Sequence, residues 1–160
     1  MDFASILSIF GIYFGTLIVA FICGFIPIAS SELFLVAAYL FLPKGSVFPV
    51  IAIILLMVLG QMIAKSIFYF AGKGIIKISV KKNNKKFRKA IKKFKKWENK
   101  LGALIFLSAA IGVPPFYITS FLCGSFKINY FKFLLFGSLG WIIRFSAILV
   151  FPYLFKVFIF

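Results

Sequence analysis

Histidine is absent from this 160-residue sequence, and acidic residues number only three: Asp2, Glu32 and Glu98. Without histidine the chain can form neither a Ser-His-Asp triad nor a histidine-ligated metal site, and scattered carboxylates offer no paired acid and base. Two cysteines, Cys23 and Cys123, make no disulfide scaffold; small packing residues are favoured over a disulfide. The sequence therefore predicts no enzymatic activity, no metal and no cofactor.

Apolar residues dominate what remains. They make up 63% of the chain, and the mean hydropathy is +1.11, whereas soluble domains are about 45–50% apolar. The N-terminus lacks the positive charge of a secretory signal because Asp2 follows Met1. We expect residues 1–26 to be retained, and we interpret residues 1–160 as a single multi-pass, all-α membrane domain.

The first half of the chain predicts a broken apolar segment followed by a complete span. Residues 6–26 are long enough to cross a bilayer, but Pro27 interrupts them. Residues 33–42 would reach only about 15 Å as a helix, half a bilayer. We therefore interpret residues 1–46 as a first hairpin, although a full span for residues 6–26 stays open. Residues 47–74 are expected to form a transmembrane helix ending at Gly72-Lys73-Gly74.

A strongly basic stretch separates the two halves. Residues 73–100 hold 13 of the 19 lysines and arginines, and from Phe87 onward apolar residues recur at helical spacing. We expect residues 75–100 to form an amphipathic helix on an anionic lipid surface. Nucleic acid is the less favoured partner because both ends of this stretch are tethered to the membrane. The expected lipid contacts are Lys85, Lys86, Arg88, Lys89, Lys92, Lys93, Lys96 and Trp97.

The second half repeats the pattern of the first. Residues 101–127 form an apolar run broken by Pro114-Pro115, and such breaks are tolerated only where protein or a wet cavity surrounds them. A re-entrant hairpin is therefore expected there. Residues 131–151 are expected to form the last span, with Pro152 and a short aromatic tail beyond it.

The two halves also share sequence at an offset of 80 residues. Leu59-Gly60, Ile63 and Ser66 match Leu139-Gly140, Ile143 and Ser146. Coincidence is a serious alternative in so biased a composition, and the arrangement of breaks carries more weight. A hairpin makes no net crossing and a span makes one, so the second copy would be inverted, as in many transporters. The predicted fold is two inverted repeats, each a re-entrant hairpin plus a span, joined by the basic helix.

Two charges are expected inside the membrane. Arg144 lies twelve residues beyond Lys132, about 18 Å along a helix, and the length of residues 33–42 places Glu32 at a similar depth. Opposite charges in low dielectric should pair or line a wet cavity. We predict a contact between Glu32 and Arg144. A role in locking the repeats together and a role in binding a ligand both stay open.

The remaining candidate binding residues flank the expected breaks. Ser30 and Ser31 precede a half-helix as N-cap residues do, and half-helix N-termini can also hold an anion. Pro115 fits the first position of the other half-helix. Snorkelling is favoured for Lys65, and helix packing for Tyr117, over ligand binding. The full set of candidates is Glu32, Arg144, Ser30, Ser31, Lys65, Pro114, Pro115 and Tyr117.

Taken in order, several short motifs resemble the DedA/VTT family, also called SNARE-associated Golgi proteins, over roughly residues 20–150. These motifs are Pro27-x-x-x-Ser31-Glu32, Tyr69-Phe70-Ala71-Gly72-Lys73-Gly74, Ala110-Ile111-Gly112-Val113-Pro114-Pro115, Cys123-Gly124, Phe131-Lys132-Phe133 and Gly140-Trp141-Ile142-Ile143-Arg144-Phe145. The resemblance implies two facing re-entrant loops and movement of phospholipids or polyprenyl phosphates between leaflets.

Three positions depart from the family pattern. The resemblance puts the family's first membrane acid at Glu32, but its second acid falls on Lys65. The arginines that flank the family's second hairpin fall on Ile111 and Tyr117. These departures weaken the expectation of proton-coupled transport, and Lys65 and Arg144 are the cations available as substitutes.

The function that we predict is translocation of membrane lipids between leaflets, with an anionic head group at the half-helix tips. Alternatives are an ion- or proton-coupled transporter of small solutes and a membrane scaffold that recruits partners through the basic helix. The positive-inside rule predicts that residues 73–100 are cytoplasmic, and the plasma membrane is the expected location. Homo-oligomerisation stays open.

Overall fold

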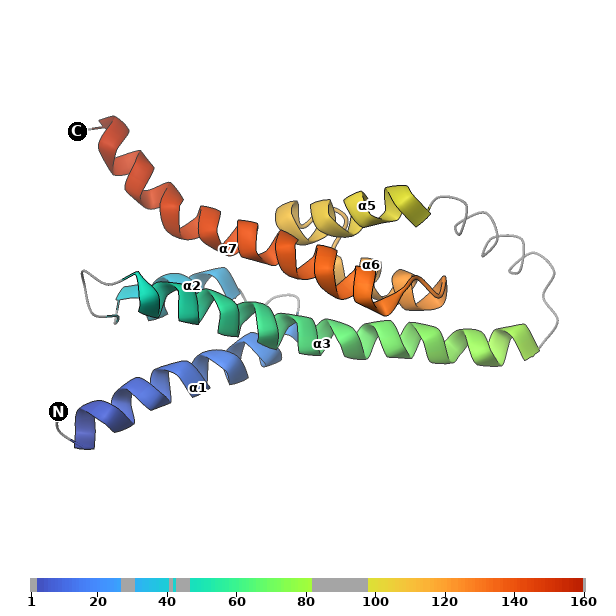
Figure 1. The fold of residues 1–160 in the computed structure, drawn as a ribbon, viewed down its shortest axis with the longest axis horizontal. Coiled ribbons are helices and arrows are strands. Elements are labelled where there is room, and N and C mark those ends of the chain that lie inside the picture. Colours follow the sequence, from blue (N-terminus) through green and yellow to red (C-terminus); the bar gives the residue numbers. More distant parts are fainter. Residues whose placement is uncertain (1–2, 27–30, 41, 43–46, 82–97, 160) are drawn as a thin grey trace. The chain divides into compact units, whose positions relative to one another are not determined.

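The computed structural model describes residues 3–26, 31–40, 42, 47–81 and 98–159, and every regular element among them is an α-helix. The helices are α1 (Phe3–Phe25), α2 (Ser31–Leu40), α3 (Phe48–Lys81), α5 (Glu98–Ile111), α6 (Phe116–Ser125) and α7 (Tyr130–Ile159) (Figure 1). Apolar helices long enough to cross a membrane occur at Phe48–Gly74 and Tyr130–Val150. The expected all-α class is confirmed, and both segments expected to span are helices long and apolar enough to do so.

Two helices continue beyond their expected ends. The prediction that α3 stops at Gly72-Lys73-Gly74 is wrong, because the helix runs on to Lys81. Gly72 marks a close helix contact instead: a Cβ there would lie 3.1 Å from the backbone nitrogen of Ser125 on α6. The expected end near residue 151 is also wrong, because α7 passes through Pro152 to Ile159. Proline is tolerated in membrane helices where neighbouring groups satisfy the freed carbonyl.

The predicted basic helix cannot be placed as a separate element. Its first residues, 75–81, belong to α3, and its last residues, 98–100, belong to α5. Residues 82–97, with all eight expected lipid contacts, lie outside the described residues.

The chain divides into two compact units. Unit 1 contains Met1–Ala64 and Ile142–Phe160, and unit 2 contains Lys65–Trp141. Each of the long helices α3 and α7 has one segment in unit 1 and another in unit 2. In unit 1, helices α1 and α2 contact one another, and in unit 2, α5 and α6 do so.

Small residues bring the helices of unit 1 together. Gly60 on α3 lies so close to α1 that a Cβ would be 2.6 Å from the Cβ of Ala20 and 2.8 Å from the carbonyl oxygen of Leu17. One turn further along α3, Ala64 lies against Gly24, near the end of α1. Such close approach is the usual way in which helices associate in lipid, where no hydrophobic drive holds them together.

The equivalent contact occurs in unit 2. A Cβ on Gly140 of α7 would lie 2.6 Å from the Cβ of Ala109 and 2.6 Å from the carbonyl oxygen of Phe106, both on α5. Gly140 follows Gly60 by 80 positions, and Ala109 follows Ala20 by 89. In each unit, a glycine of a long helix therefore lets the first helix of the shorter pair (α1 or α5) pack closely against it.

Aromatic rings fill the rest of unit 2. The ring of Phe133 on α7 stacks on Tyr69 of α3 at 5.2 Å and on Phe116 of α6 at 5.9 Å. Trp141 meets Phe116 edge-on at 6.0 Å. Phe133 is fully buried, so it forms the centre of this cluster, which joins α3, α6 and α7.

We expect Gly60→Leu and Gly140→Leu each to destabilise the protein by about 1–3 kcal/mol or more, because backbone atoms of the facing helix cannot yield to the new side chain. Thermal unfolding in detergent would measure the loss. Gly74→Ala is the matched control, since a Cβ at that helical glycine meets nothing within 4 Å. The control should keep the parent melting temperature or raise it. Unchanged melting of both leucine variants would contradict the packing described here.

Candidate functional site

An ion pair joins α2 to α7 within unit 1. Nη2 of Arg144 donates to Oε1 of Glu32 at 2.6 Å, and the two side chains are 26% and 28% exposed. The chain places Glu32 in the first turn of α2, where the helix dipole favours an anion. The contact predicted from the sequence is confirmed, across 112 residues of chain.

Pairing is what makes these charges tolerable among apolar helices. A single arginine or aspartate at the centre of a membrane helix costs about 2.5–3.5 kcal/mol on insertion scales. The short, charge-assisted bond offsets part of that cost for both partners. About a quarter of each side chain remains accessible at the surface of the unit.

Ser31 extends the polar site toward the start of α2. It is the first helical residue, is 4% exposed, and lies with its Oγ 3.4 Å from Oε2 of Glu32. The serine hydroxyl therefore faces the carboxylate of the ion pair. The other expected capping residue, Ser30, lies outside the described residues.

The sequence interpretation missed Gln61. This amide lies in the middle of α3 and is only 2% exposed, with its Oε1 3.4 Å from the position that a Cβ on Gly24 would take. A lone amide within an otherwise apolar span was the available signal, since polar groups in hydrocarbon are costly. Gln61 adds a second kind of polar group to the helices of unit 1.

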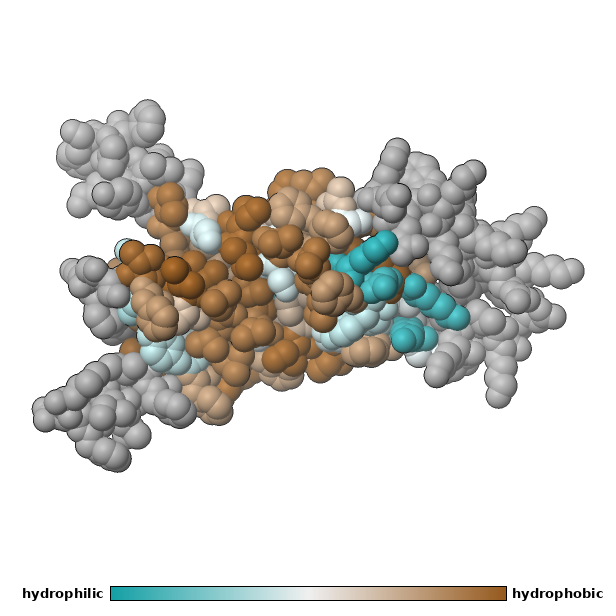
Figure 2. Space-filling model, in the orientation of Figure 1, coloured by the Kyte–Doolittle hydropathy of each residue, from teal (hydrophilic) through white to brown (hydrophobic). Residues whose placement is uncertain are grey.

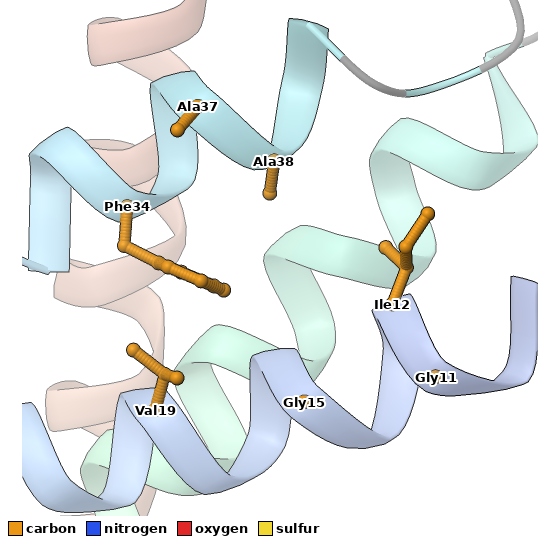
Figure 3. Close-up of a pocket in the computed structure, with 7 residues that line it drawn as sticks. All are labelled: Gly11, Ile12, Gly15, Val19, Phe34, Ala37 and Ala38. Atoms are coloured by element: carbon orange, nitrogen blue, oxygen red, sulfur yellow. The ribbon is translucent and has the colours of Figure 1, made fainter. Parts of the chain in front are cut away.

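Apolar residues line a cavity of about 350 Å³ between α1 and α2. Figure 3 shows Phe34 of α2 and Val19 of α1 pointing toward one another, while Gly11 and Gly15 leave open space on α1. The lining residues are Gly11, Ile12, Gly15, Val19, Phe34, Ala37 and Ala38. All of these described lining residues are glycine or apolar, so they offer no group that recognises a charge.

Lys65 lies in unit 2 and is 7% exposed. Its Nζ is 5.6 Å from the centre of the Phe68 ring, within the range of a cation–π interaction. A snorkelling lysine would extend its ammonium to the surface, so that interpretation is wrong. Burial against an aromatic ring is the arrangement that the sequence did not predict.

The proline break in unit 2 satisfies its own polar groups. Oγ of Ser108 donates to the carbonyl oxygen of Pro114 at 2.6 Å and lies 2.9 Å from Oγ1 of Thr119. Pro115 is the N-cap residue of α6, one position earlier than expected. Gly112 ends α5 with a φ of 88°, a conformation that suits glycine. The break is thus a closed turn whose carbonyl at Pro114 is paired.

Tyr117 follows this break on α6, and its ring centre lies 6.3 Å from that of Phe68 on α3. Thr119 and Ser120 behind it are buried, and Ser120 bonds back to the carbonyl oxygen of Phe116 at 2.6 Å. These contacts agree with the packing role expected for Tyr117 and its neighbours. Ile111 and Val113 beside the break are 66% and 74% exposed, and Pro114 and Pro115 are exposed as well.

These features define an apolar helical protein with two helices long enough to cross a membrane, two further helix pairs and, among the described residues, an ion pair between α2 and α7. The VTT domain family matches residues 26–154. The chain belongs to this membrane-associated family, whose domain is that of the DedA/SNARE-associated Golgi proteins, and the resemblance noted from the sequence is confirmed. Neither the curated proteins nor the solved structures provided a match.

A double-mutant cycle tests the ion pair. We expect Glu32→Gln and Arg144→Met each to lower stability, because each leaves a charge without its partner. The double variant should lose less than the sum, with a coupling of about 0.5–3 kcal/mol. Thermal unfolding in detergent provides the values, and Arg144→Lys, which keeps the charge, should lose less than Arg144→Met. Additive losses would show that the two side chains do not interact.

Proposed function

We propose that this protein moves lipids between the leaflets of a membrane, and that the Glu32–Arg144 pair receives the anionic head group. The observation that carries the proposal is an accessible ion pair within an apolar helical unit. A phosphate competes with Glu32 for the Arg144 guanidinium, which can bind either anion through two parallel hydrogen bonds. Exchange of one anion for the other keeps the arginine paired while the lipid passes.

The lengths of α2 and α6 support a membrane arrangement with two re-entrant hairpins, in which α1 is the first arm of its hairpin although its 23 residues are enough to cross a bilayer. Helices α2 and α6 have 10 residues each, so each reaches about 15 Å and cannot cross a bilayer. In this proposal the pair α1–α2 enters and leaves the membrane from the same side, and so does the pair α5–α6. Helices α3 and α7 cross the membrane. The equivalent close helix contacts at Gly60 and Gly140 support a duplicated unit. A single crossing between the copies makes the second one inverted.

The basic loop 73–100 sets the orientation in this proposal. Its lysines and arginines keep it cytoplasmic by the positive-inside rule, and residues 80–100 bind the anionic surface of the plasma membrane. The protein performs no covalent chemistry in this scheme.

Reconstitution tests the proposal. A quencher that cannot cross the membrane is added outside liposomes that contain a lipid labelled at its head group. Empty liposomes should lose only the outer-leaflet fluorescence, whereas liposomes containing the purified protein should also lose the inner-leaflet fluorescence. We expect Glu32→Gln and Arg144→Ala to slow this exchange by about tenfold or more, equivalent to about 1.4 kcal/mol. Leu104→Ala on α5, whose side chain is 44% exposed, is the control and should exchange lipid at the parent rate.

Two results would overturn the proposal. One is parent-like lipid exchange by both charge variants that remain folded, which would remove the ion pair from the process. The other is absence of lipid exchange together with uptake of a small solute driven by a pH gradient. That second result would favour coupled transport, with the Glu32 carboxylate as the proton carrier.

A further inference from the structure

Unit 2 carries exposed lysines on three separate segments. Lys73 lies on α3, Lys127 follows α6, and Lys132 lies in the first turn of α7. Figure 2 shows hydrophilic side chains gathered at the end of unit 2 where these segments meet, beside an otherwise apolar surface. We call this group of three the lysine cluster.

Hydrogen bonds hold the three segments together. The hydroxyl of Tyr69 on α3 donates to the carbonyl oxygen of Ile128, next to Lys127. Tyr130, at the start of α7, donates through its hydroxyl to Oγ of Ser66 on α3 at 2.9 Å. The positions of the lysines therefore follow from buried and half-buried contacts, and are not a property of one flexible loop.

The backbone at Lys127 is unusual for a lysine. Helix α6 ends in a Schellman motif: the N–H of Lys127 donates to the carbonyl oxygen of Gly124 at 3.1 Å, and the N–H of Ile128 donates to that of Cys123 at 3.0 Å. Lys127 occupies the left-handed position with a φ of 55°, where glycine or asparagine fits with less strain. The backbone conformation at this position therefore gives no reason for a lysine in place of glycine or asparagine.

One explanation for the charge is local, since a cation near a helix C-terminus gains about 0.3–1 kcal/mol from the helix dipole. That account does not extend to Lys132, which lies at the N-terminal end of α7, where a cation is disfavoured. Asn129 already caps that end, its Oδ1 accepting from the backbone N–H of Phe131 at 2.8 Å. The helix dipole therefore favours Lys127 alone, and what the two lysines share is exposure at one end of unit 2.

The charge around the cluster is almost entirely of one sign. Glu98 is the only acidic residue between positions 65 and 141. Lys77 and Lys81 follow Lys73 within α3, so the sequence of this helix carries further positive charge. Phe131, 71% exposed, immediately precedes Lys132, and Leu122, 41% exposed, lies five residues before Lys127. A cationic patch bordered by exposed apolar groups matches the boundary between head groups and acyl chains.

We propose that Lys73, Lys127 and Lys132 form a binding site for the phosphate groups of anionic phospholipids at the cytoplasmic surface. The site is distinct from the basic run 80–100 and from the Glu32–Arg144 pair. It requires the proposed membrane orientation but no lipid movement, so its test can succeed where the translocation test fails. Each lysine near an anionic surface contributes about 1 kcal/mol, or about fivefold in affinity.

The test begins from the full chain with the neighbouring run neutralised. In this parent, every basic residue of the run 80–100 is replaced by glutamine: Lys81, Lys82, Lys85, Lys86, Arg88, Lys89, Lys92, Lys93, Lys95, Lys96 and Lys100. Native mass spectrometry of the detergent-solubilised protein then measures how strongly phosphatidylglycerol is retained relative to phosphatidylcholine. We expect a clear preference for phosphatidylglycerol, and Lys73→Gln, Lys127→Asn and Lys132→Gln should each reduce it by about fivefold.

The pair Lys127→Asn and Lys127→Arg separates charge from backbone strain. Asparagine suits the left-handed position, so the first variant should melt at or near the parent temperature while losing phosphatidylglycerol. Arginine keeps the charge and should keep the lipid preference. Equal preference in the parent and the triple variant would overturn the proposal. A triple variant that loses binding of a short oligonucleotide but not of phosphatidylglycerol would overturn the assignment to lipid.

Discussion

A polar group without a partner is costly in hydrocarbon, and this single constraint accounts for the main features of both units. Each unpaired backbone group there costs several kcal/mol, and a charge costs more. Where the second helix pair breaks at Pro114, the hydroxyl of Ser108 supplies the missing donor. Where a charge occurs in unit 1, Arg144 meets Glu32. Thr16 and Ser120 instead bond to carbonyl oxygens of their own helices, at Ile12 (2.7 Å) and Phe116 (2.6 Å).

Close packing is the complementary requirement, since apolar helices in lipid gain little from hiding apolar surface. Gly60 and Gly140 let the long helices approach α1 and α5, and Gly124 lets α6 approach Tyr69 of α3. In unit 1 this packing brings the end of α1 against the middle of α3. In unit 2 it orders the segment around Lys127. The positions of the charged residues therefore depend on close helix contacts made by glycines.

Local composition was sufficient to predict much of the fold and part of the site. Length and apolar content identified both long spans, and depth along the helices correctly predicted the contact of Glu32 with Arg144. The expected helix ends were wrong at Gly72 and Pro152, because glycine and proline were taken as terminators. In α3 the glycine serves a contact with α6, and contacts between distant segments leave no local mark. Lys65 was misassigned for the same reason, since its burial depends on residues from other parts of the chain.

The sequence by itself determined that the protein is helical and membrane-associated, with few charges in its apolar segments and a basic stretch between two similar halves. These properties follow from composition and periodicity, which act residue by residue. Only the tertiary structure decided which polar groups meet: Ser108 with Pro114 and Thr119, Tyr130 with Ser66, and the three lysines at one end of unit 2. These polar contacts depend on how closely the helices approach one another. That distance is set by the packing of glycines and aromatic rings from segments far apart in the chain.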